Sequence, residues 1–124
     1  MEHYVIQEST KNCPGIVHYL KSNTLEISGR SIHENPEIFF MPLIDWLEVH
    51  FEASNSLNVR IQLEYINSGS AKCLIELLKK LTGYKRSGKD VTMKWLFEED
   101  DESMQELGEH YRDNAGIPLI IEMV

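Results

Sequence analysis

The chain has 124 residues, 42% of them hydrophobic and 26% charged, which is the balance of a globular protein with its own core. Its net charge of −8 would repel the phosphates of a nucleic acid and an anionic membrane surface, so the charge argues against both partners. The length fits a single domain over residues 1–124. Two cysteines without a CxxC motif, and no apolar signal-peptide core, favour a reducing cytoplasm.

The first part of the chain predicts a hairpin followed by a helix. Residues 1–14 are polar and are expected to form a lead-in segment. The stretches 16–20 and 24–30 are short and apolar or alternating, and the turn between them favours a hairpin. We place the start of the next helix near residue 42, after a short turn at 36–40, because proline suits a first helical turn better than a helix interior. The apolar positions at helical spacing are Phe40, Leu43, Ile44, Leu47 and Phe51.

The middle of the chain carries the clearest strand. Residues 57–67 alternate strictly between apolar and polar side chains, which predicts one buried and one solvated face, with Tyr65 in the buried set. A helix is predicted at 70–82, and Gly83 is placed to form its C-cap. The buried stripe of that helix is expected to be Ala71, Leu74, Ile75, Leu78 and Leu81.

The last part predicts a strand at 90–99, a weaker helix at 100–113 and a closing strand at 117–124. The resulting order, β-β-α-β-α-β-α-β, favours an α/β fold with a mixed, mostly parallel sheet. Because the strands alternate instead of being apolar throughout, we expect the helices to cover mainly one face. The other face is expected to stay exposed or to meet a partner, and it carries Glu26, Arg30, Arg60, Gln62, Glu64 and Lys94.

Two hydroxyls lie where the strand at 57–67 gives way to the helix at 70–82. The junction reads Asn67, Ser68, Gly69 and Ser70. A serine there could cap the helix by accepting a hydrogen bond from a free backbone N–H. It could equally accept a phosphoryl group, because unpaired N–H groups and the positive end of the helix dipole tolerate a phosphate. The residues of the junction leave both interpretations open.

Enzyme and metal signatures are missing from the sequence. No GxSxG motif is present, and no histidine has an evident relation to Ser68, so a serine hydrolase fits poorly. We therefore predict no catalytic residue, no metal site and no cofactor. His18 and His50 are expected to be solvated or at an edge. The histidines are scattered at His3, His18, His33, His50 and His110 without an HxxxH or HExxH spacing.

An acidic run spans residues 98–102, where the helix at 100–113 should begin. It can complement the dipole of that helix, contact a basic partner or bind a divalent cation weakly, although the DxDxDG calcium loop is absent. Trp95 falls on a buried position of its strand and is expected to be structural. Trp46 lies off the main apolar stripe of its helix and is a candidate contact residue.

Four blocks of the sequence, residues 25–35, 42–48, 63–74 and 93–109, resemble the SiaC family of bacterial regulatory phosphoproteins. The blocks agree in order and spacing from about residue 14 onward. The resemblance implies a fold similar to STAS-type anti-sigma-factor antagonists, which agrees with the element order predicted above.

The resemblance also implies a function without catalysis. Members of the family are partner switches modified by a serine/threonine kinase and reset by a PP2C-type phosphatase. The unphosphorylated form binds and activates a diguanylate cyclase, which raises cyclic di-GMP and promotes biofilm growth. An alternative is a switch like an anti-sigma-factor antagonist that acts on another partner.

The family motif Y-x-N-[TS]-[SG]-S implies a phosphoacceptor directly after the asparagine that ends the strand. On this chain that residue is Ser68, with Ser70 as the fallback. The implied partner-binding surface is Asn67, Ser68, Gly69, Ser70, Lys72 and Trp46.

Overall fold

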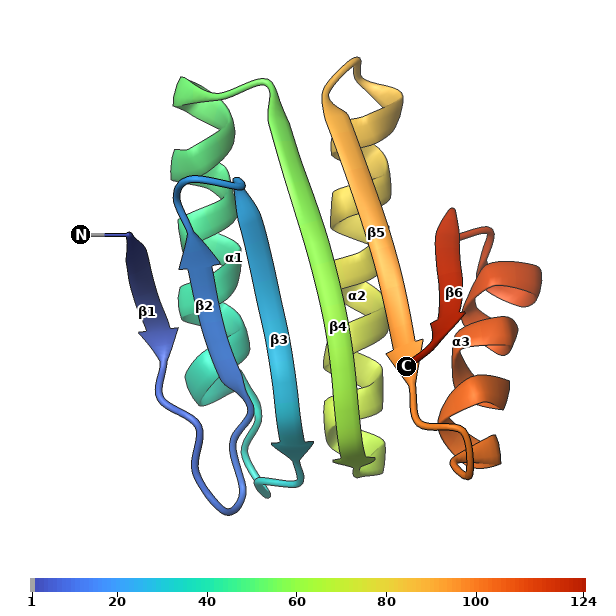
Figure 1. Ribbon diagram of the computed structural model, residues 1–124. Coiled ribbons are helices and arrows are strands. Elements are labelled where there is room, and N and C mark those ends of the chain that lie inside the picture. Colours follow the sequence, from blue (N-terminus) through green and yellow to red (C-terminus); the bar gives the residue numbers. More distant parts are fainter. Residues whose placement is uncertain (1) are drawn as a thin grey trace.

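The computed structural model describes residues 2–124, which fold into six strands and three helices (Figure 1). In chain order the elements are β1 (His3–Gln7), β2 (Gly15–Tyr19), β3 (Thr24–Ser31), α1 (Glu37–Ala53), β4 (Ser56–Ile66), α2 (Ser68–Arg86), β5 (Asp90–Phe97), α3 (Glu102–Ala115) and β6 (Leu119–Met123).

All the strands belong to one sheet in the order β1-β2-β3-β4-β5-β6. The first three strands pair antiparallel, and β3 to β6 pair parallel, so the prediction of a mixed, mostly parallel sheet is confirmed. The sequence did not predict β1, which lies within the expected lead-in. This strand forms the outer edge of the sheet, and its residues Tyr4 and His3 are exposed, so it lacks the apolar alternation of a covered strand.

The helices lie on one side of the sheet, as the alternating strands predicted. In Figure 1, α1 and α2 run behind the strands, and α3 flanks β5 and β6. The core lies between these layers. Its fully buried side chains include Leu25, Ile27, Val59, Ile61 and Trp95 from the sheet and Leu43, Leu47, Leu74 and Leu78 from the helices.

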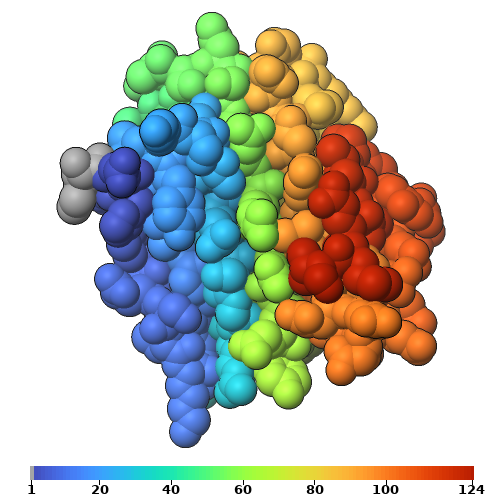
Figure 2. Space-filling view, viewed as in Figure 1, coloured from blue at the N-terminus to red at the C-terminus, as the bar shows by residue number. Residues whose placement is uncertain are grey.

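The other face of the sheet has no helix over it, and Figure 2 shows its strands at the surface from β1 (blue) to β6 (red). Three ion pairs cross between strands on this face. They are Arg60–Glu26 at 3.5 Å, Arg30–Glu64 at 3.8 Å and Lys94–Glu122 at 3.5 Å. Because these side chains are partly exposed, each pair stabilises the fold by only about 0–1 kcal/mol.

The predicted start of α1 near residue 42 was wrong, because the helix begins at Glu37. Its hydrogen bonding starts early, with the Phe40 amide donating to the Pro36 carbonyl at 3.1 Å. Pro42 therefore lies inside the helix, and its missing N–H removes a helical donor only from the carbonyl of Ile38. Ile38 and Pro42 are both exposed, so water can replace that donor.

Tyr65 does not point into the core as predicted. The pairing of β3 with β4 shifts register, so that Gly29 faces Leu63 but Arg30 faces Tyr65. The extra residue in β4 is a β-bulge, which turns Tyr65 to the open face, where it is 58% exposed. The Arg30 guanidinium lies 5.2 Å from the centre of the Tyr65 ring.

The predicted end of α2 at Gly83 was also wrong, because the helix continues to Arg86 and is capped by Ser87. Tertiary contacts stabilise the additional turn. The ring of Tyr84 stacks on Phe51 of α1 at a centroid distance of 4.3 Å, and Lys85 Nζ donates to the Val91 carbonyl at 2.7 Å. None of the helices that residues 2–124 form is long and apolar enough to cross a membrane.

Candidate functional site

Asn67 fixes the junction between β4 and α2 through both its backbone and its side chain. The Asn67 amide donates to the Ser31 carbonyl at 3.0 Å, and its Nδ2 donates to the His33 carbonyl at 3.1 Å. Asn67 Oδ1 accepts a hydrogen bond from the Ser70 amide at 2.8 Å. One side chain therefore ties the first turn of α2 to the segment that follows β3.

The same contacts show which residue caps α2. Asn67 has the extended backbone of an N-cap (φ −89°, ψ 172°), and its side chain accepts from the third residue of the helix. The interpretation of a serine as the cap was therefore wrong. Ser68 is the first residue of α2, and its hydroxyl is not needed to cap the helix.

The two serines of the junction have opposite environments. Ser68 and Gly69 are exposed, whereas Ser70 is fully buried at 0% exposure. Among the described residues, Ser70 Oγ has no hydrogen-bond partner. An enzyme that approaches the folded protein can therefore reach the hydroxyl of Ser68 but not that of Ser70.

The surroundings of Ser68 favour a negative charge. The Ser70 amide bonds to the Asn67 side chain and the Ala71 amide bonds to the Asn67 carbonyl, which leaves the Ser68 and Gly69 amides as the free donors of the first turn. That turn has no acidic side chain, and the exposed Lys72 follows four residues after Ser68 on the same side of the helix. A phosphate on Ser68 would meet free N–H groups, the helix dipole and a cation.

The beginnings of α1 and α2 lie side by side at this end of the molecule. The Cβ that a side chain at Gly69 would add lies 3.8 Å from Pro36 Cγ. Burial raises the pKa of the Cys73 thiol, and the nearby Glu37 carboxylate raises it further. Three apolar side chains in the segment after β3 and the first turns of α1 are exposed, namely Ile32, Ile38 and Met41.

Trp46 is not brought into contact with this junction. Its indole packs against His18 and stacks on His50, each at a ring-centroid distance of 4.8 Å. Along the axis of α1, Trp46 lies roughly 14 Å from Glu37, the first residue of the helix. The structure therefore brings Asn67, Ser68, Gly69 and Lys72 together and leaves Trp46 in a separate aromatic cluster.

The expectation that His18 and His50 are solvated or at an edge was wrong for His18, which is only 8% exposed and lies on β2 between β1 and β3. His50 is half-buried beside it. His18 Nε2 donates to Asn23 Oδ1 at 2.8 Å, and His50 Nε2 donates to the Ser56 carbonyl at 2.9 Å. Both nitrogens are donors because both partners are oxygens that can only accept. The Asn23 oxygen is identified by the amide group of the same side chain, which donates to the Ser56 carbonyl. Each ring thus makes one hydrogen bond through Nε2 and packs against neighbouring aromatic rings.

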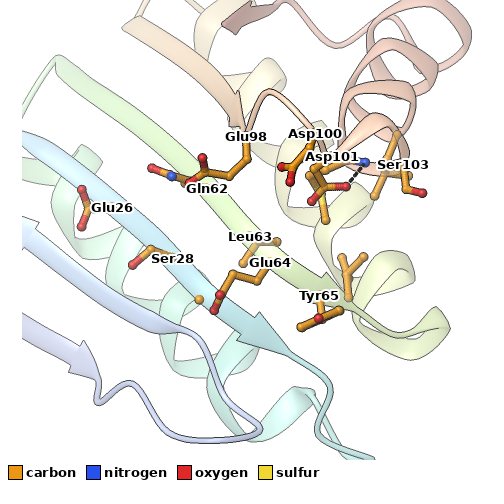
Figure 3. A pocket seen from close by; sticks show the side chains of 14 residues that line it. Glu26, Ser28, Gln62, Leu63, Glu64, Tyr65, Glu98, Asp100, Asp101 and Ser103 are labelled. Carbon is orange, nitrogen blue, oxygen red and sulfur yellow. Dashed lines mark hydrogen bonds between the residues drawn. The ribbon is translucent and has the colours of Figure 1, made fainter. Parts of the chain in front are cut away.

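The acidic run at 98–102 lies mostly before α3. Asp101 caps the helix, with its Oδ1 accepting from the Met104 amide at 3.1 Å, and Glu102 is the first helical residue. The interpretation as an acidic helix start is therefore correct for Asp101 and Glu102. Glu98 and Asp100 instead line a groove of about 1020 Å³ beside the end of β4 (Figure 3).

No group of three or more His, Cys, Asp or Glu side chains in residues 2–124 is arranged to hold a metal ion. Within residues 2–124, the exposed hydroxyl of Ser68 and the groove are the features that we consider for a function. The sequence pointed to the first and missed the second.

The chain matches the sequence profile of the SiaC family, described as regulatory phosphoproteins, over residues 7–124. It is 27% identical over 114 residues to an uncharacterised protein of Pseudomonas aeruginosa (strain UCBPP-PA14), and the match covers 91% of this chain and 90% of that protein.

Two solved structures share the fold across nearly their whole length. Apo-SiaC from Pseudomonas aeruginosa superposes with a TM-score of 0.82 at 25% identity, covering 98% of this chain and 99% of that one. The second is SiaC bound as activator to the diguanylate cyclase SiaD of the same organism. It superposes with a TM-score of 0.84 at 26% identity, covering 94% of this chain and 96% of that one.

Proposed function

Because this chain belongs to the SiaC family of regulatory phosphoproteins, we propose that it is a binding protein controlled by phosphorylation of Ser68. The unmodified form binds and activates an effector. A serine/threonine kinase adds the phosphoryl group, and a PP2C-type phosphatase removes it. The protein itself acts by binding and not by catalysis.

The observation that carries this proposal is that different residues cap α2 and present a hydroxyl at its start. Asn67 caps the helix, so the exposed Ser68 hydroxyl is free to be modified without loss of the cap. Phosphorylation would add about −1.5 to −2 charges to an exposed position that tolerates them. The switch would therefore change the surface and leave the fold in place.

A diguanylate cyclase is the effector that we propose. The support is the relative SiaC, which is bound to the diguanylate cyclase SiaD as its activator and shares the fold of this chain. An effector that packs over Ser68 would have to remove water from a phosphate of about −1.5 to −2 charges, of which the free amides and Lys72 neutralise only a part. Burying a charge in this way is unfavourable, so the modified form should release the effector.

Calorimetry with a purified cyclase of the kind bound by SiaC tests the proposal. Ser68→Ala should bind like the wild type, and Ser68 carrying a phosphoryl group should bind at least about tenfold more weakly, which corresponds to about 1.4 kcal/mol. Ser22→Glu is the matched control, because Ser22 is exposed in the β2–β3 turn at the opposite end of the strands. Equal binding of the phosphorylated and unmodified forms would contradict the proposed switch.

A further inference from the structure

The strand β4 is paired along most of its length with β3 but only along its first half with β5. On one side, β4 pairs with β3 up to Ile66. On the other side, its pairing with β5 ends where Ile61 faces Trp95. Residues 62–66 of β4 therefore have a neighbouring strand on one side only. A strand edge without a neighbour presents N–H and C=O groups that can pair with another chain.

The groove of about 1020 Å³ reaches from the open face of β3, at Glu26 and Ser28, across the end of β4 to this free edge (Figure 3). Its far wall is formed by the loop after β5 and the first turns of α3. The groove combines apolar and acidic side chains. The apolar ones are Leu63, Ile66, Met104 and Leu107, and the acidic ones are Glu26, Glu64, Glu98, Asp100 and Asp101.

The charges of the groove are unbalanced. No lysine or arginine lines it. Glu26 and Glu64 pair with arginines of the open face, and Asp101 caps α3, but Glu98 and Asp100 form no ion pair with any residue between 2 and 124. Figure 3 shows Glu98 close to Gln62 on the β4 side, with Asp100 on the loop opposite.

We propose that this groove binds an extended segment of a partner protein that carries lysine or arginine at alternate positions. The backbone of the segment would pair with the free edge at residues 62–66 of β4. Because side chains alternate along a strand, one set would enter the apolar wall at Leu63 and Leu107, and the other would meet the carboxylates of Glu98 and Asp100. This surface is additional to the Ser68 switch, and its binding requires no phosphorylation.

The groove and the switch are compatible. Ser68 follows the free edge after Ile66 and Asn67, and a phosphate there has the same sign as the carboxylates of the groove. Phosphorylation would not repel a basic segment. A partner held in the groove could thus stay bound in both states of Ser68.

The test uses the full chain and a fluorescent peptide of about eight residues in which leucine and lysine alternate, with binding followed by anisotropy. The comparison peptide has the same composition, with the leucines in one block and the lysines in another. The alternating peptide should bind at least about tenfold more tightly than the block peptide. Equal binding would show attraction by net charge alone and would overturn the proposal.

Two double variants separate the groove from the overall charge. Glu98→Gln/Asp100→Asn should weaken binding of the alternating peptide by about tenfold or more. Glu34→Gln/Glu52→Gln removes the same charge at exposed positions outside the groove lining and should change binding less than about twofold. The proposal fails if the two double variants weaken binding equally.

Amide exchange provides an independent readout that does not depend on any variant. Binding of the alternating peptide should protect backbone amides within residues 62–66, and a peptide methylated on its backbone nitrogens should not. Protection elsewhere, or dimerisation of the chain through this edge in place of peptide binding, would contradict the proposal. Failure of kinase treatment to modify Ser68 would leave these results unchanged, so the two proposals are tested separately.

Discussion

The side-chain oxygen of Asn67 accepts the backbone N–H of Ser70 at 2.8 Å, and this bond separates the structural role of the β4–α2 junction from its chemical role. An asparagine holds the helix start. The neighbouring Ser68 is left exposed, with a hydroxyl that the fold does not use.

This separation predicts different effects for two neighbouring substitutions. Asn67→Ala removes the cap and the bond to the His33 carbonyl, so it should lower the free energy of unfolding by about 1–2 kcal/mol. Ser68→Ala should lower it by less than about 0.5 kcal/mol. Urea denaturation of both variants checks this. A loss from Ser68→Ala as large as that from Asn67→Ala would show that the hydroxyl is structural.

Gly108 allows α3 to approach Trp95. A Cβ added at Gly108 would lie 2.5 Å from Trp95 Cδ1 and 2.6 Å from its Nε1, while that indole nitrogen donates to the Met104 carbonyl at 2.9 Å. Gly108→Ala should therefore destabilise the fold by about 1–3 kcal/mol despite the better helix propensity of alanine.

Gly83→Ala is the matched control for Gly108→Ala. Gly83 also lies within a helix, but a Cβ there would have no neighbour within 4 Å. This variant should be more stable than the wild type by about 0.5–1 kcal/mol in thermal or urea unfolding. Equal effects of the two substitutions would refute the close packing of α3 on Trp95.

Pro42 is predicted to weaken α1. Pro42→Ala restores an N–H that can donate to the exposed carbonyl of Ile38, and it should raise the free energy of unfolding by about 1 kcal/mol. The gain is smaller than the propensity difference because proline also restricts the unfolded chain. Pro36→Ala is the contrasting control: Pro36 is buried at the N-cap, so this change should destabilise the protein. A less stable Pro42→Ala variant would contradict the prediction.

Tyr111 should make the free energy of unfolding fall as the pH rises in the alkaline range. Burial raises its pKa to about 12 from an ordinary value of 10.0, and its hydroxyl donates to the Ala71 carbonyl at 3.2 Å. Above about pH 10 the unfolded chain loses this proton while the folded chain keeps it, so the contribution is complete below pH 10 and is lost as the pH rises towards 12.

The measurement compares wild type with Tyr111→Phe, which cannot ionise. Between about pH 9 and pH 11 the wild type should lose about 1 kcal/mol more of its free energy of unfolding than the variant. Parallel losses in the two proteins would show that Tyr111 is not the titrating group.

The sequence predicted most of the fold because its strands alternate with high regularity. Val91, Met93 and Trp95 are buried as their spacing indicated, and the order of strands and helices after β1 is as predicted. What escaped prediction depends on tertiary contacts. The extra residue in β4 that turns Tyr65 outward, and the aromatic cluster around His18, arise from neighbours distant in the sequence.

The sequence likewise predicted one part of the candidate site and missed another. Asn67 to Ser70 stood out in the sequence as a strand-to-helix junction, but only the structure distinguishes the exposed Ser68 from the buried Ser70. The groove could not be predicted, because it results from the different points at which β4 loses its two neighbouring strands. Periodicity within one strand carries no information on where its partner diverges.

The strand order β1 to β6 has a consequence for how the protein is made, because neighbours in the sheet are also neighbours in the chain. The sheet can grow outward by adding each new strand to its latest edge, and no strand has to insert between two that are already paired. During synthesis, β3 and β4 can pair before α3 and β6 emerge, so the strands that precede Ser68 can form early. The wall of the groove that α3 provides can form only later.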